Sequence, residues 1–186
     1  VVLGAAADEV LAKADLSGAT AVVNPDWATG MGSSLRAGLA ALAASASRPA
    51  AASASDPTAS VAVGPAASVA SAPGGPAASA NAPVDAVCVL LVDTPGITAG
   101  AVRRVAGRAA PAALAVATYH GEPGHPVLLG RDHWSAVAEM AVGDVGARRY
   151  LARHPDLVAS VPCEDIAVGD DLDVPRDLPG PDPSPR

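Results

Sequence analysis

Acidic residues follow two apolar segments of the chain, and they are the residues best suited to bind a metal ion. Asp93 comes directly after the apolar run 86–92, while Asp171 and Asp173 lie in the acidic segment 164–178. In an extended segment, Asp171 and Asp173 point to the same side. Mg²⁺ binds one or two carboxylates together with phosphate oxygens and water. Carboxylates from two strand ends that meet in one crevice would therefore form a Mg²⁺ site.

Each of these acidic groups also has an ordinary structural interpretation. Asp93 or Thr94 could cap the helix that follows, as many acids at strand ends do. The segment 164–178 could be a solvated acidic turn. Position in the sequence alone leaves the two interpretations of Asp93 open.

A glycine- and serine-rich turn precedes the second predicted helix. Gly30 and Gly32 have no side chains and lie where the first turn of a helix exposes free N–H groups. A planar base or a phosphate could therefore approach the backbone there. Ser33 and Ser34 add hydroxyl groups that could contact base edges. The same residues also form an ordinary helix cap, with Ser33 or Ser34 in the capping position.

Two further short motifs carry groups that could contact a substrate. His125 stands between a glycine and a proline, which predicts a rigid turn that presents the imidazole either to a substrate or to solvent. In the segment "GDVGAR", 143–148, Arg148 could bind an anion or could pair with Asp144.

Alternating strands and helices are predicted to position these residues. Strands followed by helices are typical of βαβ units, so we expect an α/β fold with a mostly parallel, doubly wound sheet and helices on both faces. In the helix over 33–44, Leu35, Leu39 and Leu42 form one buried stripe. The predicted strands are 1–3, 19–24, 86–92, 113–119, 126–130 and 157–163, and the other predicted helices are 7–14, 98–110, 131–141 and 144–154.

Composition limits the domain organisation and the class of protein. The segment 44–83 is almost entirely Ala, Ser, Pro and Gly, so we expect a disordered insertion in a single domain over 1–178, followed by a disordered tail over 179–186. The net charge of −7 argues against a nonspecific nucleic-acid binder and against a polybasic membrane patch. The start of the chain lacks a signal peptide and no apolar run is long enough to span a membrane, so a cytoplasmic protein is expected.

Five segments, taken in order, resemble the MobA-like nucleotidyltransferases, and within them the molybdenum cofactor cytidylyltransferases. The segments are "VVNPDWATGMGSSLRAGLAAL", "VCVLLVDTPGIT", "GEPGHPVLLGR", "VGDVGARRYLARHP" and "GDDLDVPRDL". The resemblance implies a Rossmann-like nucleotidyltransferase fold. It also implies Mg²⁺-dependent transfer of a nucleoside monophosphate, CMP being favoured, from a nucleoside triphosphate to a molybdopterin-type phosphorylated acceptor, with release of pyrophosphate. A molybdoenzyme or a maturation protein is the expected partner.

The resemblance also implies roles for individual residues. Asp93 and Asp173 match the family's catalytic metal ligands, with Asp171 beside them. The turn before the second helix matches the region that reads the base, and three residues match the acceptor side. The base-reading residues are Gly30, Gly32, Ser33 and Ser34, and the acceptor-side residues are His125, Asp144 and Arg148.

The chain departs from the family pattern at its start. Family members open with a strand and a loop of the type LAAGxSxRMGxPK, whose amides, Arg and Lys hold the triphosphate, and nothing in this chain matches that loop. The sequence therefore predicts a first βα unit that is missing and an activity that is impaired. Two alternatives follow: an inactive nucleotide- or partner-binding domain of the same fold, and a nucleotidyltransferase that acts on a sugar phosphate or phospholactate.

Overall fold

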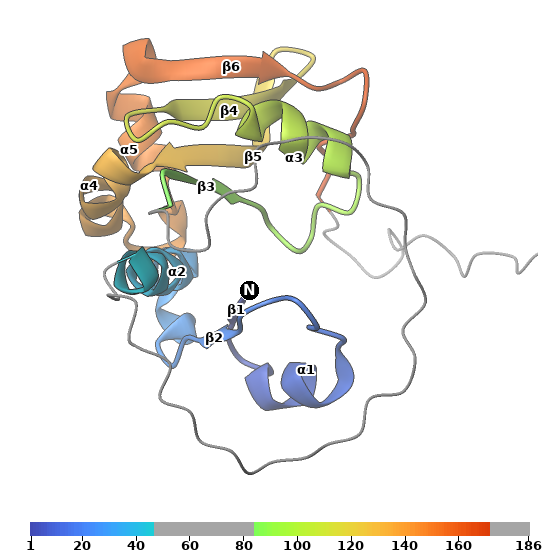
Figure 1. Cartoon of the computed structure of the whole chain (residues 1–186), viewed down its shortest axis with the longest axis vertical. Coiled ribbons are helices and arrows are strands. Elements are labelled where there is room, and N and C mark those ends of the chain that lie inside the picture. Colours follow the sequence, from blue (N-terminus) through green and yellow to red (C-terminus); the bar gives the residue numbers. More distant parts are fainter. Residues whose placement is uncertain (47–83, 172–186) are drawn as a thin grey trace, which may run out of the picture.

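A computed structural model describes residues 1–46 and 84–171, and it shows an α/β fold, as predicted (Figure 1). The first part of the chain forms a small βαβ unit. Strand β1 (Val2–Leu3) leads through helix α1 (Ala7–Lys13) to strand β2 (Val22–Val23), and the two strands pair in parallel. Residues 47–83, which belong to the expected insertion, and residues 172–186, which include the expected tail 179–186, lie outside the described residues.

The second part of the chain forms a four-stranded sheet in the order β3-β5-β4-β6. Its strands are β3 (Ala86–Val89), β4 (Leu114–Tyr119), β5 (Glu122–Gly130) and β6 (Val158–Pro162). Strands β4 and β6 are parallel, whereas β5 runs antiparallel to both of its neighbours. The prediction of a mostly parallel sheet is therefore wrong, because this sheet is mixed.

The hairpin between β4 and β5 explains the reversal. His120 and Gly121 alone connect the two strands, and both have positive φ angles, 53° and 90°. Positive φ at both central residues defines the turn whose twist suits a two-residue hairpin. Strand β5 consequently begins at Glu122, and His125 lies within the strand rather than in the predicted turn.

All the predicted helices are present, and several are shorter than predicted. Helix α2 (Met31–Ala46) is the longest and runs two residues beyond its predicted end. The others are α3 (Ala99–Ala106), α4 (Trp134–Met140) and α5 (Arg148–Arg153). Four short 3₁₀ turns join the elements: η1 (Trp27–Thr29), η2 (Arg131–His133), η3 (Gly143–Val145) and η4 (Pro155–Leu157).

Helices cover both faces of the four-stranded sheet, as predicted, because side chains alternate along its strands. On one face, strand residues such as Leu114 and Val116 pack with Leu39 of α2 and with residues of α4 and α5. On the other face, Ala115 and its neighbours pack with residues of α3. The predicted leucine stripe of α2 is confirmed, since Leu39 is buried and the two flanking leucines pack against the same cluster.

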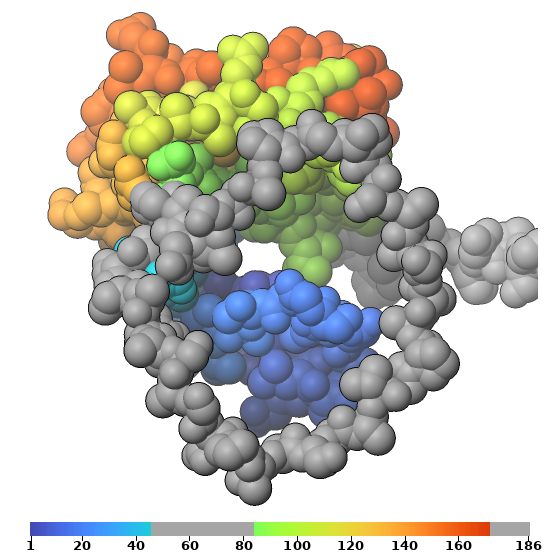
Figure 2. Space-filling model, viewed as in Figure 1, coloured from blue at the N-terminus to red at the C-terminus, as the bar shows by residue number. Residues whose placement is uncertain are grey.

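Helix α2 packs on both sheets. Gly38 approaches Val2 of β1, while Leu39 belongs to the core of the four-stranded sheet. Down the view in Figure 1, the strands follow as β6, β4, β5, β3, β1 and β2. In Figure 2, the blue residues at the start of the chain form the lower part of the molecule, below the green-to-red part. Within the described residues, β1 and β3 each pair on one side only.

Strand β3 differs from the prediction in length and burial. The apolar run was expected to be a strand up to Val92 and to be buried on both faces, but the strand ends at Val89 and its four residues are half-buried. Burial is lower because β3 is the end strand of its sheet in the described structure. Val92 is fully exposed, so the apolar run continues beyond the strand into a surface loop.

Candidate functional site

Asp93 lies in an exposed loop after β3, four residues beyond the end of the strand. The neighbouring Thr94 is buried, and its hydroxyl donates to the carbonyl oxygen of Leu91 at 2.9 Å. Helix α3 is capped by Thr98, whose hydroxyl oxygen accepts a hydrogen bond from the Ala101 amide. The alternative that Asp93 or Thr94 caps this helix is therefore wrong, and the Asp93 carboxylate faces solvent.

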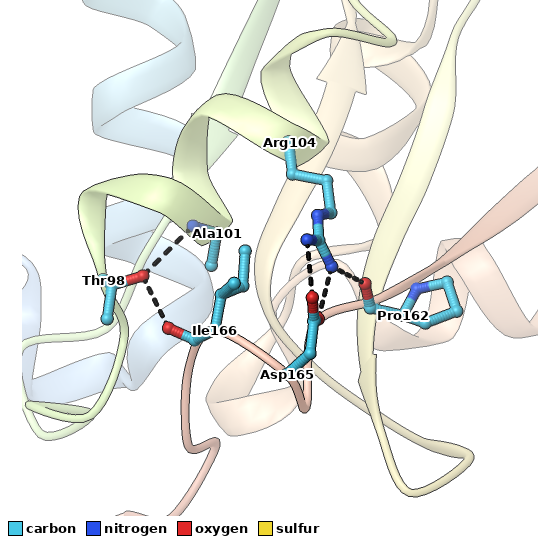
Figure 3. Close-up of polar contacts among 6 residues, drawn as sticks. All are labelled: Thr98, Ala101, Arg104, Pro162, Asp165 and Ile166. Atoms are coloured by element: carbon cyan, nitrogen blue, oxygen red, sulfur yellow. Dashed lines mark hydrogen bonds and ion pairs between the residues drawn. The ribbon is translucent and has the colours of Figure 1, made fainter.

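The loop after β3 is hydrogen-bonded to the segment after β6. The Thr98 hydroxyl donates to the carbonyl oxygen of Ile166 at 3.0 Å (Figure 3), and the amide of Val168 donates to the carbonyl oxygen of Gly96 at 3.1 Å. A side chain on Gly96 would collide with the carbonyl of Val168, so glycine permits this close approach. The two acidic segments that the sequence analysis singled out therefore meet at the end of the sheet where β3 and β6 both terminate.

This contact places Asp93 and Asp171 in the same region of the surface. Asp93 precedes Gly96 by three residues and Asp171 follows Val168 by three residues, so each is about 10 Å of chain or less from the Gly96–Val168 hydrogen bond. Both side chains are exposed. Asp173, the second predicted metal ligand, lies outside the described residues.

An ion pair fixes the segment after β6. The Arg104 guanidinium of α3 donates to both carboxylate oxygens of Asp165, at 2.5 and 2.8 Å, and also to the carbonyl oxygen of Pro162 (Figure 3). The hydrogen bonds from Arg104 lower the pKa of Asp165 below its ordinary value. Because the bidentate geometry holds both partners in one orientation, it anchors the chain that leads to Asp171.

The glycine- and serine-rich turn is organised by Asn24, a buried residue that the sequence analysis did not single out. The Asn24 amide donates to the hydroxyl oxygens of Ser33 at 2.8 Å and Ser34 at 3.0 Å. Ser33 is buried and its hydroxyl lies 2.8 Å from the carbonyl oxygen of Gly30, so this hydroxyl is used within the protein. Ser34 is half-buried, and in the described part of the chain its hydroxyl hydrogen has no acceptor.

The predicted base-reading turn lies against the predicted acceptor segment. The amide of Met31, the first residue of α2, donates to Asp144 Oδ1 at 3.2 Å. Asp144 therefore caps the helix, in place of the predicted serine cap. A Cβ on Gly30, whose φ is 107°, would lie 2.5 Å from the Gly143 carbonyl carbon, and a Cβ on Gly32 would lie 2.5 Å from the Ala141 carbonyl oxygen. The missing side chains at both glycines thus bring the two segments into contact.

His125 and Arg148, the other residues predicted on the acceptor side, lie apart from that contact. His125 Nδ1 is 3.1 Å from the carbonyl oxygen of Val89, at the end of β3, and the Tyr119 hydroxyl donates to the His125 carbonyl oxygen. Arg148 is the first residue of α5 and is exposed. The predicted alternative that Arg148 pairs with Asp144 is wrong, because the described ranges contain no ion pair between them. The ion pairs present are Lys13–Glu9, Arg104–Asp165 and Arg131–Asp85.

The residues present suit a Mg²⁺ ion that takes most of its ligands from substrate and water. Within residues 1–46 and 84–171, no group of three His, Cys, Asp or Glu side chains is close enough to hold a metal. Asp93 and Asp171 each offer hard oxygen ligands from segments that are hydrogen-bonded to one another, and Mg²⁺ uses one or two carboxylates with phosphate oxygens and retained waters. This donor set fits Mg²⁺ better than Zn²⁺, which favours Cys and His.

Comparison with known proteins identifies the family. A family model described as "MobA-like NTP transferase domain" matches residues 1–158, and the chain belongs to this family. Nicotine blue oxidoreductase from Paenarthrobacter nicotinovorans is 33% identical over 180 residues, which cover 93% of this chain and 69% of that protein.

A crystal structure has a similar fold. It is that of a homologue of Mycobacterium tuberculosis Rv0371c from Mycobacterium sp. strain JC1, with a TM-score of 0.59, 27% identity, and coverage of 94% of this chain and 67% of that one. The Rossmann-like nucleotidyltransferase fold is thereby confirmed, and the family supports nucleotidyltransferase activity in general. No helix in the described part of the structure is long and apolar enough to cross a membrane.

Proposed function

We propose that this chain binds Mg²⁺ and a nucleoside triphosphate, with CTP favoured, and transfers the nucleoside monophosphate to a molybdopterin-type phosphorylated acceptor. Membership of the MobA-like NTP transferase domain family supports the reaction class. The observation that carries the assignment to this surface is the hydrogen-bonded contact between the loop after β3 and the segment after β6, through Gly96 and Val168. That contact joins the segments that carry Asp93 and Asp171, at the end of the sheet where β3 and β6 terminate.

The reaction needs positioning and charge stabilisation more than covalent help from the protein. An acceptor phosphate oxygen attacks the α-phosphorus, the bond to the β-phosphate oxygen breaks, and pyrophosphate leaves. Asp93 and Asp171, with Asp173 expected beside them, would hold Mg²⁺, which when bound neutralises charge on the phosphates. The turn at Gly30 and Gly32 is held against the backbone of Gly143 and Ala141, and beside it Ser34 offers a hydroxyl donor to the nucleotide.

Of the three residues proposed on the acceptor side, Asp144 touches the nucleotide turn. Asp144 accepts a hydrogen bond from the Met31 amide and so links the acceptor side to the start of α2. Arg148 is exposed four residues further along the chain and offers a guanidinium to the acceptor phosphate. His125, anchored near the end of β3, is the remaining side chain on that side.

The test compares Asp93→Asn with a matched variant, Asp156→Asn. Asp156 is an exposed acid in η4, at the opposite end of β6 from the acidic segment. Pyrophosphate release from CTP, with a molybdopterin-type acceptor and Mg²⁺, is expected to fall about 10²–10³-fold in Asp93→Asn, the loss typical of one preorganised electrostatic group. Asp156→Asn is expected to match the wild type.

Mg²⁺-dependent CTP binding is measured in parallel. Equal turnover of Asp93→Asn and wild type would contradict the assignment of the site. Binding of Mg²⁺–CTP without turnover on any acceptor would instead support a nucleotide-binding domain of the same fold. A panel that includes sugar phosphates and phospholactate, with ATP and GTP beside CTP, decides the acceptor and the nucleotide.

A second candidate function comes from the oxidoreductase relative. Nicotine blue oxidoreductase is 33% identical over nearly all of this chain, so the same fold serves a redox activity in that protein. A chain with that activity would catalyse a redox reaction of nicotine blue with a second electron carrier. A change in nicotine blue absorbance that depends on the protein and on an added electron donor, in the absence of pyrophosphate release, would favour this candidate over nucleotidyl transfer.

A further inference from the structure

Tyr119, the last residue of β4, lies against two glycines that belong to separate parts of the chain. A Cβ on Gly124 of β5 would lie 3.0 Å from Tyr119 Cδ2 and Cε2. A Cβ on Gly169, in the segment after β6, would lie 2.5 Å from Cδ2, 2.8 Å from Cε2 and 2.9 Å from Cγ. The missing side chains therefore let the ring contact both backbones directly. Through Gly169 the ring supports the segment that reaches Asp171 two residues later.

The tyrosine is itself held in place by the sheet. Its side chain is half-buried and packs against the core cluster on the face that α3 covers. The amide of Cys163 donates to the carbonyl oxygen of Thr118 at 2.9 Å, which joins the end of β4 to the end of β6. Because the ring is already ordered by packing, using it as a support costs no further conformational entropy.

A β-bulge in β5 connects the tyrosine to the neighbouring strand. The pairing of β5 with β4 skips His125 and Pro126, which have no partner on β4. The carbonyl oxygen of His125 accepts a hydrogen bond from the Tyr119 hydroxyl at 2.7 Å. Bulges redirect side chains and are frequent beside active sites.

The redirected imidazole of His125 reaches the strand that leads to Asp93. Its Nδ1 lies 3.1 Å from the carbonyl oxygen of Val89, the last residue of β3. A carbonyl oxygen only accepts hydrogen bonds, so Nδ1 carries the proton and donates to it. Asp93 follows Val89 by four residues. The tyrosine is thus connected to one acidic segment through its ring and to the other through its hydroxyl and the bulge.

We propose that Tyr119 is a positioning residue for the Mg²⁺ site, which holds Asp171 in a fixed place relative to Asp93. The inference deepens the proposed function and rests on it, because the relative position of the two carboxylates matters only if they share an ion. The ring contact lies one residue beyond the main-chain hydrogen bond of Val168, on the side of Asp171. Groups that orient metal ligands raise the affinity of a metal site.

The test measures binding of Mn²⁺ alone, so that neither a nucleotide nor turnover is needed. Mn²⁺ uses the same carboxylate and water ligands as Mg²⁺, and free Mn²⁺ is measured by electron paramagnetic resonance during a titration. Tyr119→Leu removes the ring and is expected to weaken binding about 10–100-fold, the range for loss of groups that orient metal ligands. Gly169→Ala keeps the tyrosine but places a methyl group against its ring, so binding is expected to weaken as well. Tyr119→Phe keeps the ring and loses one hydrogen bond, which limits the expected loss to about 5-fold.

Tyr150→Phe is the matched control, because Tyr150 is the other tyrosine of the chain. Its hydroxyl lies 2.8 Å from His133 Nδ1, and its ring belongs to the core cluster on the opposite face of the sheet. Its Mn²⁺ affinity is expected to equal that of the wild type. Amide hydrogen exchange of residues 164–171 in the metal-free protein is expected to be faster in Tyr119→Leu and Gly169→Ala, and unchanged in the control.

The inference is overturned if Tyr119→Leu and Gly169→Ala bind Mn²⁺ as tightly as the wild type while Asp93→Asn binds it weakly. If Tyr119→Leu does not fold, Gly169→Ala decides, because that substitution lies after the last strand. An equal loss of Mn²⁺ affinity in Tyr150→Phe and Tyr119→Phe would also overturn it, since the effect would then be one of general stability. A wild type that binds no Mn²⁺, or whose binding Asp93→Asn leaves unchanged, would overturn the proposed site and the inference with it.

Discussion

Replacing Gly32 by alanine tests the contact between the start of α2 and the segment that follows α4. A Cβ at Gly32 would lie 2.5 Å from the Ala141 carbonyl oxygen and 2.6 Å from its carbonyl carbon. These are backbone atoms, so they cannot rotate away as a side chain would. The Arg36 guanidinium donates to the same carbonyl oxygen, so a shift of Ala141 also disturbs that hydrogen bond.

Three effects set the size of the change in the free energy of unfolding. Overpacking costs about 1–3 kcal/mol, and loss of the Arg36 hydrogen bond costs ~1 kcal/mol. Replacing glycine by alanine within a helix returns ~1 kcal/mol. The net destabilisation is therefore about 1–3 kcal/mol. For a chain of this length, each kcal/mol lowers the Tm by about 2–4 °C, so a loss of ~2 kcal/mol gives a decrease of about 4–8 °C.

Gly38→Ala in the same helix is the control. A Cβ at Gly38 would lie 3.2 Å from a methyl group of Val2, which is the end of a side chain and can shift. This variant gains the same helix propensity without meeting backbone, so its Tm is expected to be equal to or slightly above that of the wild type. Thermal unfolding followed by circular dichroism measures both variants. Equal Tm values for Gly32→Ala and Gly38→Ala would refute the argument that the Ala141 backbone excludes a side chain.

Two further predictions concern backbone strain and pH. Gly18 has a φ of 80° and open space around it, so Gly18→Ala is expected to lower the free energy of unfolding by about 1–2 kcal/mol. Gly30→Ala is expected to lower it by more, because the new Cβ also meets backbone. Equal losses for the two variants in urea unfolding would show that the backbone contact at Gly30 is unimportant. Because Arg104 lowers the pKa of Asp165, the pair stabilises the fold above the ordinary carboxylate pKa and this contribution is lost as the pH falls through the acid range. The difference in stability between wild type and Asp165→Asn, measured by urea unfolding, should therefore shrink toward low pH, and a difference that grew on acidification would contradict this sign.

Local sequence patterns were sufficient to predict the helices of this protein. The leucine spacing in α2 predicts a buried stripe, and Leu39 is buried as expected. The direction of β5 was not predictable from apolar spacing, because alternation is the same in parallel and antiparallel strands. The informative signal was the pair His120–Gly121 between two apolar runs, since a two-residue connection can only join antiparallel strands.

The candidate site was predictable in part. The two acidic segments were identified from their positions after apolar runs, and the structure brings the loop of Asp93 to the segment of Asp171. Which groups hold these segments in place could not be read from the sequence, because Arg104 and Asp165 are 61 residues apart and meet only in the folded chain. Asn24 was also missed, although an amide between a strand and a proline is a local signal of a structured turn.

The split between the two sheets leaves main-chain hydrogen-bonding capacity unused. The Arg131 amide donates to the Asp85 carbonyl, so the backbone groups of Asp85 and of every second residue after it face β5. The backbone amides and carbonyls of Ala86 and Cys88 therefore point away from β5. On β1, the carbonyls of Val1 and Leu3 bind β2, which leaves the peptide groups of Val2 directed outward. These groups have no hydrogen-bond partner among the described residues. Any extended segment that reached either edge could pair through its main chain alone, whatever its side chains.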